Sequence, residues 1–130
     1  MILFIQLGMT AATVLFAVGL WHRHRNNALH RKLMATGMGV FLSTAVGLVA
    51  WVNLAGATYA PAPWLVELAG GEPQARRVLT AHRGLATLAF IWMALTAHAG
   101  AKRLPRHKQM APWAVVLWLA AYGSGLVIFQ

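Results

Sequence analysis

Histidine is the residue type whose chemistry stands out, because the chain has no cysteine and only two acidic residues, Glu67 and Glu72. Imidazole is the commonest metal ligand in proteins and titrates near neutral pH. The candidates are His22, His24, His30, His82, His98 and His107. With no carboxylate in any apolar segment, the sequence argues against a di-iron site, a proton-relay enzyme or an acid–base hydrolase. We therefore predict metal or heme ligands but no catalytic residue.

Two of these histidines occur in matching contexts. His30 lies in "ALHRKLM" and His107 lies in "RHKQMAPW", and each stands beside cations immediately before a long apolar segment. Many membrane folds contain such internal repeats. The match predicts a duplicated helical hairpin with one histidine at the start of each second helix.

The composition indicates the elements that carry the histidines. Of the 130 residues, 59% are hydrophobic and 10% are charged, whereas a globular domain carries about 25% charged residues. The apolar residues form segments over residues 2–21, 33–54, 78–100 and 110–129. Each segment is long enough to cross about 30 Å of hydrocarbon as a helix. We predict an all-α, single-domain membrane four-helix bundle, whose first segment is a retained span rather than a cleaved signal peptide.

The basic residues predict the orientation. Eight of the eleven flank the two turns: Arg23, Arg25, Arg31, Lys32, Lys102, Arg103, Arg106 and Lys108. We predict a multi-pass protein of the bacterial inner membrane. The positive-inside rule places loops 22–32 and 101–109 in the cytoplasm, and both termini and loop 55–77 outside. The net charge of +9 thus indicates a lipid bilayer as partner and not nucleic acid. Within the outer loop, "WLVELA" predicts a short interfacial helix with Trp64 at headgroup depth, which either covers the bundle or docks a larger partner.

Small residues recur every four positions in the second segment, at Ala35, Gly39, Ser43 and Gly47. Such a stripe permits close approach of a neighbouring helix. The same gap is also a candidate space for a flat cofactor such as a porphyrin. Both interpretations stay open at this stage.

Helical geometry limits how the histidines combine. His82 and His98 are sixteen residues apart, which is about 24 Å along a helix and too far to share one metal. His30, His98 and His107 are expected at one level, where two would suit the axial sites of a heme iron and three would suit copper or zinc. His82 lies about one turn inside the third segment, where an unpaired imidazole is costly. Simple interfacial contacts are the alternative role for each histidine.

The chain resembles the YozB/CtaM-like family of small membrane proteins over residues 26–129. The resemblance rests on "ALHRKLM", "AHRGLA" and the helix "HKQMAPWAVVLWLAAYGSGLVI", with the pattern Trp-x-x-x-Tyr-x-x-Gly at Trp118, Tyr122 and Gly125. Family members commonly carry a further histidine near the outer end of the second helix. This sequence has Trp51 and Asn53 there.

The resemblance implies a metal- or heme-handling factor for assembly of a respiratory heme–copper oxidase or for copper delivery, with His30, His82 and His107 as ligand candidates for copper or heme b. The missing histidine favours an alternative, a non-catalytic accessory subunit that contacts other membrane subunits of a respiratory or photosynthetic electron-transfer complex. A third possibility is a b-type cytochrome subunit in quinone-linked electron transfer, with His30 or His98 opposite His107. More faintly, the helix-start histidines are similar to those of cytochrome b561-type proteins.

Overall fold

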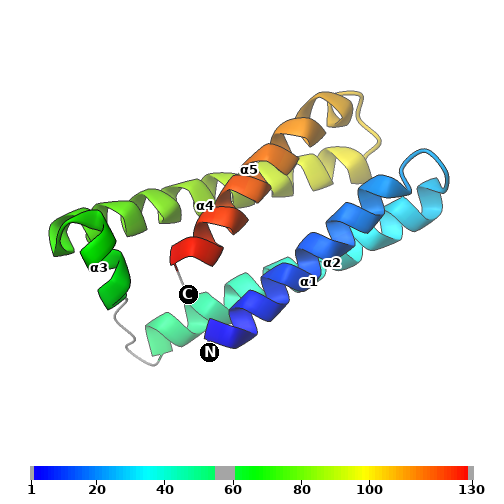
Figure 1. The fold of residues 1–130 in the computed structure, drawn as a ribbon. Helices are drawn as coiled ribbons and strands as arrows, with labels where there is room; N and C mark the ends of the chain where they lie inside the picture. Colours follow the sequence, from blue (N-terminus) through cyan, green and yellow to red (C-terminus); the bar gives the residue numbers. More distant parts are fainter. Residues whose placement is uncertain (1, 55–60, 129–130) are drawn as a thin grey trace. The chain divides into compact units, whose positions relative to one another are not determined.

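The computed structural model describes residues 2–54 and 61–128 and confirms the all-α prediction (Figure 1). Nothing in this part of the chain is a strand. The helices are α1 (Ile2–Trp21), α2 (Asn27–Leu54), α3 (Pro63–Ala69), α4 (Glu72–Ala101) and α5 (His107–Ile128). The chain divides into two compact units, Met1–Thr58 and Tyr59–Gln130.

Four helices, all except α3, are long and apolar enough to span a membrane, as the sequence predicts. Many large apolar side chains on them are exposed, for example Leu3, Leu7, Val46 and Leu95. Exposed apolar faces of this extent suit a lipid environment. The chain therefore has the architecture of a multi-pass membrane protein.

Three of the long helices begin before the apolar segments that predict them. α2 begins at Asn27, α4 at Glu72 and α5 at His107, whereas the apolar segments begin at 33, 78 and 110. Hydropathy detects only the part of a helix that lies in hydrocarbon, and polar residues extend a helix into the headgroup region. Because of these extensions, His30 and His107 lie within helices and not in loops.

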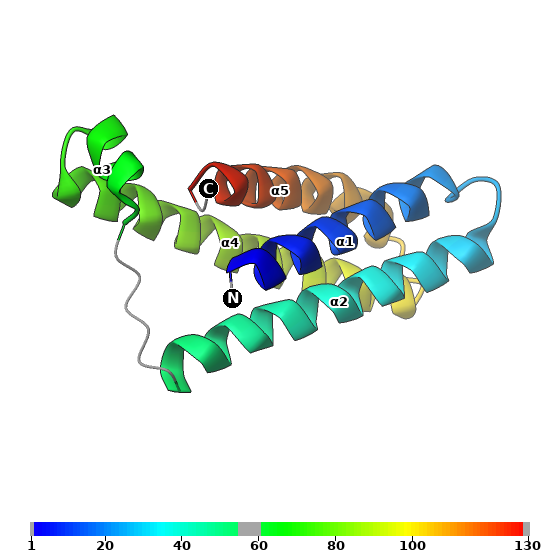
Figure 2. The ribbon, with the colours of Figure 1, turned by 60° about the horizontal axis from the view of Figure 1, so that its bottom comes forward.

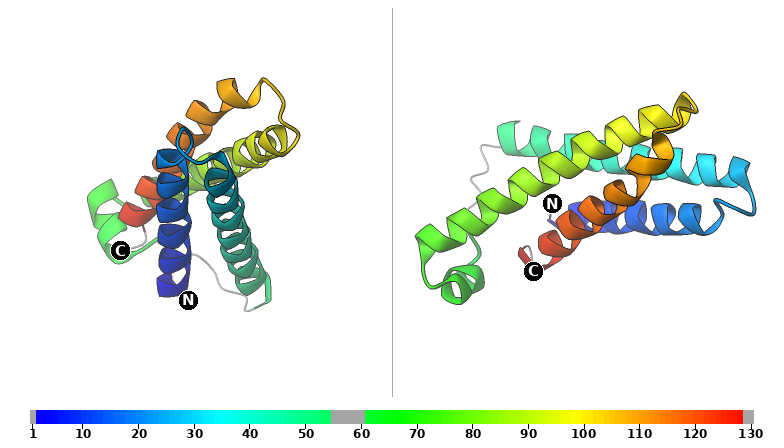
Figure 3. Two further views of the ribbon diagram at one scale, coloured as in Figure 1. Left: turned by 90° about the vertical axis from the view of Figure 1, so that its right-hand side faces the viewer. Right: turned by 90° about the horizontal axis from the view of Figure 1, so that it is seen from above.

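The first unit is an antiparallel hairpin of α1 and α2, whose helices lie side by side in Figures 2 and 3. Asn26 is the N-cap of α2, because its Oδ1 accepts a 2.9 Å hydrogen bond from the Leu29 N–H. The buried apolar residues are Ala12, Phe16 and Phe41. A Cβ on Gly37 would lie 2.8 Å from Phe16 Cε1, so glycine is what allows the two helices to approach here.

The second unit contains α3, α4 and α5, with α4 and α5 antiparallel (Figures 1 and 3). The short helix α3 confirms the helix predicted for "WLVELA". It packs on the first part of α4, where Leu65, Ala75 and Leu79 form a buried cluster with Ile128 at the end of α5. The Trp64 indole N–H is buried in this region and has no acceptor among the described residues. Its predicted position at headgroup depth stays a prediction.

The two hairpins share one pattern of buried positions. In the first hairpin the buried positions are Ala12, Phe16, Gly19, Gly37, Phe41 and Thr44. Each one, shifted by the 77 residues that separate His30 from His107, falls on a buried position of α4 or α5: Ala89, Met93, Thr96, Ala114, Trp118 and Ala121. Because most of these residue types differ, the shared pattern reflects a shared backbone arrangement. It supports the predicted duplication.

Candidate functional site

His30 connects the two helices of the first hairpin. Its Nδ1 lies 2.7 Å from the Gly19 carbonyl oxygen, and the contact is partly buried. Gly19 is among the last residues of α1, where carbonyls lack a partner within the helix. A histidine from the next helix supplies that partner.

His107 makes the same connection in the second hairpin. Its Nδ1 lies 2.9 Å from the Thr96 carbonyl oxygen, again eleven residues earlier in the chain and again partly buried. Gly100 allows the ring to lie against α4, since a Cβ there would be 2.9 Å from His107 Cε1. The repeated spacing and partner atom extend the similarity of the two hairpins to the histidine itself.

The carbonyl partner determines where the ring proton lies. A carbonyl oxygen can only accept a hydrogen bond, so Nδ1 must carry the proton in both residues. In a neutral imidazole, Nε2 then has the free lone pair. Histidines that bind metals usually donate their other ring N–H to a carbonyl or a carboxylate, which fixes the tautomer and the ring orientation. His30 and His107 both have this arrangement, which suits a heme iron or a copper ion as the acceptor of the Nε2 lone pair.

His82 belongs to a different cluster, between α4 and α5. Its Nδ1 lies 2.9 Å from Ser124 Oγ, and that hydroxyl in turn donates to the Ala120 carbonyl. Because the hydroxyl proton is used in this way, Oγ accepts the His82 Nδ1–H. Gly125 faces the ring, since a Cβ there would be 3.3 Å from His82 Cε1. The partner that sequence analysis required for His82 is therefore a serine.

The Trp-x-x-x-Tyr-x-x-Gly pattern is divided between two contacts. Trp118 is buried, and its ring is parallel to that of Tyr122 at a centroid distance of 6.3 Å. Gly125 instead makes room for His82. The pattern thus accounts for packing along α5 and against α4.

The remaining histidines have local positions. His22 Nδ1 contacts the Val18 carbonyl of the preceding turn at 3.0 Å, and His24 Nε2 accepts a 2.7 Å hydrogen bond from Arg23 Nε. His98 is exposed. It follows buried Thr96 by two residues, or about 200° around the helix, so it points away from the α4 face that holds His107.

Three-histidine metal binding finds no support in the described residues, where no group of three or more His, Asp or Glu side chains is arranged to hold a metal ion. Near the end of α2, where the family resemblance predicts a histidine, the chain has Trp51 and Asn53. The side chain of Asn53 lies outside the described residues. The convergence of His30 with His98 or His107 stays a prediction.

Most of the small-residue stripe of α2 does not pack on α1. Ala35, Gly39 and Ser43 are exposed, and no side chain of the hairpin comes within 4 Å of a Cβ built on Gly39. Gly47 has only Phe4 nearby, at 3.8 Å. The packing face instead contains Gly37 and Thr44, with Thr44 against Gly8. The contact between α1 and α2 is therefore made mainly by another face. Both roles predicted for the stripe, contact with a neighbouring helix and space for a cofactor, stay predictions.

Sequence reasoning missed the partners of the histidines. The Gly19 and Thr96 carbonyls belong to the backbone, so no residue type marks them. Ser124 had a weak signal, because it is a polar residue within the apolar stretch "YGSGLVI". Comparison with protein families, with curated proteins and with solved structures finds no match to this chain.

Proposed function

We propose that the protein is an inner-membrane factor that handles copper or heme for a respiratory heme–copper oxidase, with His30 and His107 as ligands. The observation that carries the proposal is the Nδ1–H···O=C contact at both residues. It holds each imidazole in the tautomer whose Nε2 can bind a metal. The bound group would supply redox or carrier chemistry, while the Gly19 and Thr96 carbonyls orient the imidazoles.

The donor set is compatible with the groups that the family resemblance implies. Imidazole suits copper and heme iron, and neither needs a thiolate or a carboxylate. His82 is the remaining candidate ligand. Its ring is fixed by Ser124 at the opposite end of α4 from His107, so it belongs to a separate position.

The test begins with the protein purified in detergent. We would record visible spectra before and after dithionite and measure copper, iron and zinc by elemental analysis. The proposal expects bound copper without heme, and loss of most of the copper in His30→Ala/His107→Ala. The matched control is His22→Ala/His24→Ala, which removes two histidines from the adjacent turn and should retain the metal. Equal metal loss in both variants, or no metal in the wild type, contradicts the proposal.

One observation favours a second candidate, the non-catalytic accessory subunit. Three residues of the small-residue stripe of α2, Ala35, Gly39 and Ser43, are exposed in their own hairpin, and such stripes serve helix–helix contacts in membranes. A protein without metal that purifies with larger membrane subunits, and whose histidine double variant assembles normally, would favour this function. A reduced Soret band with an α-band would instead indicate a b-type cytochrome.

A further inference from the structure

Basic residues gather at the two hairpin turns. No acidic residue of the same unit lies near either turn. The first hairpin contains no acidic residue, although Arg23, Arg25, Arg31 and Lys32 stand at its turn. The second unit contains Glu67 and Glu72, and Glu72 opens α4 whereas Lys102 follows its end. Thirty helical residues correspond to about 45 Å, so neither acid can neutralise the second turn.

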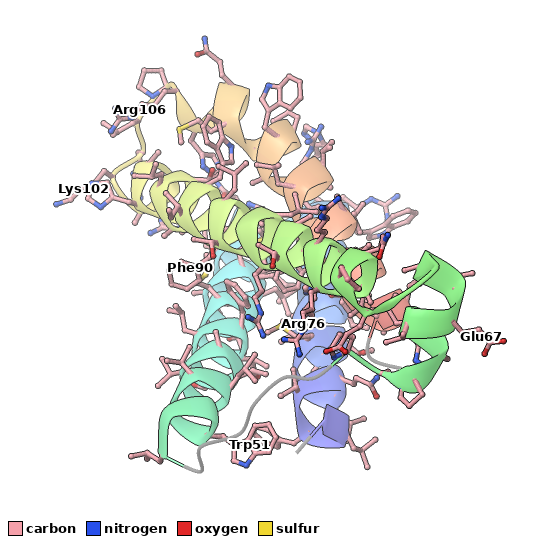
Figure 4. All side chains as sticks on the ribbon, turned by 90° about the vertical axis from the view of Figure 1, so that its left-hand side faces the viewer. Trp51, Glu67, Arg76, Phe90, Lys102 and Arg106 are labelled. Carbon is pink, nitrogen blue, oxygen red and sulfur yellow. The ribbon has the colours of Figure 1, made fainter. Side chains whose placement is uncertain are left out.

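The described acids have other surroundings. Glu72 pairs with Arg76 at 2.6 Å, one turn further along α4. Glu67 projects outward from α3, and Lys102 and Arg106 extend from the opposite end of α4 (Figure 4). Neither acid of the second unit therefore neutralises the second turn, and the first unit has no acid of its own.

Aromatic and histidine contacts orient the cations of the first turn. The Arg25 guanidinium lies 5.6 Å from the centre of the Trp21 ring, and Trp21 is 69% exposed at the end of α1. Exposed tryptophans at the ends of membrane helices lie at headgroup level. Arg23 is directed by its Nε–H bond to His24 Nε2, which leaves most of its guanidinium donors available. The Arg25 guanidinium is thus held next to Trp21, and the Arg23 guanidinium is held by His24.

The second turn keeps a cation where glycine would be favoured. α4 ends in a Schellman arrangement, with the Leu104 N–H on the Ala99 carbonyl and the Arg103 N–H on the Gly100 carbonyl. Arg103 occupies the left-handed position of this motif, with φ of 55°. Side chains other than glycine are disfavoured there. An arginine at this position gives the turn a further cation at a conformational cost.

We propose that the turns at 22–32 and 102–108 are binding surfaces for the phosphate-bearing headgroups of anionic phospholipids. Each turn places four cations immediately beyond apolar helices, and clusters of this kind bind anionic lipids. Arg25 and Arg103 are positioned for this contact by the Trp21 ring and by the end of α4. The inference does not depend on metal binding, because none of these side chains is a ligand candidate.

The test compares the affinity of the protein for two lipids. We would measure quenching of tryptophan fluorescence by brominated phosphatidylglycerol and by brominated phosphatidylcholine, at low ionic strength. The wild type should prefer phosphatidylglycerol. Each double variant, Arg23→Gln/Arg25→Gln or Lys102→Gln/Arg106→Gln, should reduce the preference by about five-fold for each cation removed. In about 0.5 M salt the preference should largely disappear.

The control variant is Arg76→Gln/Arg77→Gln, which removes the same charge from the opposite end of α4. It should keep the preference, and circular dichroism should show equal helicity in all variants. Equal affinity of the wild type for both lipids overturns the proposal, as does an equal loss in the control. Displacement of the brominated lipid by millimolar inorganic phosphate overturns it too, since the cations would then serve a free anion. Metal content should be the same in every arginine and lysine variant, so this test and that of the metal site fail independently.

Discussion

The two hairpins make the same histidine contact but pack in different ways. The first uses glycine at Gly8, Gly19 and Gly37, where a Cβ would contact the opposite helix. The equivalent positions of the second hairpin, 77 residues later, hold Leu85, Thr96 and Ala114. Small residues let membrane helices approach closely and gain van der Waals contact. The first hairpin is therefore held mainly by close packing.

The second hairpin has polar connections at positions where the first hairpin has apolar residues. Trp92 Nε1 donates to the Met110 carbonyl at 3.1 Å, and His82 bonds Ser124. The equivalent residues of the first hairpin are Leu15 and Leu33, and Ile5 and Gly47. Packing has thus diverged between the repeats, whereas the histidine at the start of the second helix and its carbonyl partner have not. The histidine contact is therefore the same in both hairpins although the packing around it differs.

The largest expected effect on stability comes from a substitution that disrupts the glycine packing of the first hairpin. Gly37→Ala places a Cβ 2.8 Å from Phe16 Cε1 and should destabilise the protein by about 1–3 kcal/mol. Adding Phe16→Met reproduces the pair Met93 and Ala114 of the second hairpin and should recover most of the loss. Gly39→Ala, on the exposed face, is the matched control. Unfolding in mixed detergent followed by circular dichroism measures each change, and a Gly37→Ala protein as stable as the control would refute the packing account.

The next effect tests whether the two histidine contacts are equivalent. His30→Ala and His107→Ala each remove one hydrogen bond between helices and should each lower the unfolding free energy by about 1 kcal/mol. His98→Ala, at an exposed position, should change it by less than about 0.5 kcal/mol. The same unfolding measurement in metal-free buffer applies. A cost confined to one of the two histidines would show that the repeats use the contact differently.

The smallest effect sharpens the comparison of the turns. Arg103→Gly removes the cost of a left-handed arginine and should stabilise the protein by about 0.5–1 kcal/mol. In the first turn, Asn26→Ala removes the cap of α2 and should cost about 1 kcal/mol. The two changes in stability should have opposite signs, because Asn26 suits the backbone of the first turn whereas Arg103 does not suit that of the second. A destabilised Arg103→Gly protein would mean that the arginine side chain contributes to folding.

Much of the fold follows from the sequence, because hydrophobic length and the need for internal backbone bonding leave helices as the only spanning structure. The short helix of "WLVELA" followed from its proline entry and glycine exit. Three of the helices begin before the apolar segments, since hydropathy does not register the polar first turns that contain His30 and His107. The packing face of α2 was also not predictable, because small residues occur on two of its faces and only contact with α1 distinguishes Gly37 from Gly39.

By itself the sequence determined that four apolar segments form membrane helices, that histidine is the main candidate for metal ligation, and that the cations gather at the turns. These properties depend on residue type and local spacing. The tertiary structure decided which atoms the histidines contact and which faces of the helices are buried. Those outcomes depend on backbone carbonyls and on helix rotation, which bring together residues such as His82 and Ser124 that are 42 positions apart. No residue type predicts a carbonyl partner, so the tautomer of His30 and His107 can be inferred only from the folded hairpins.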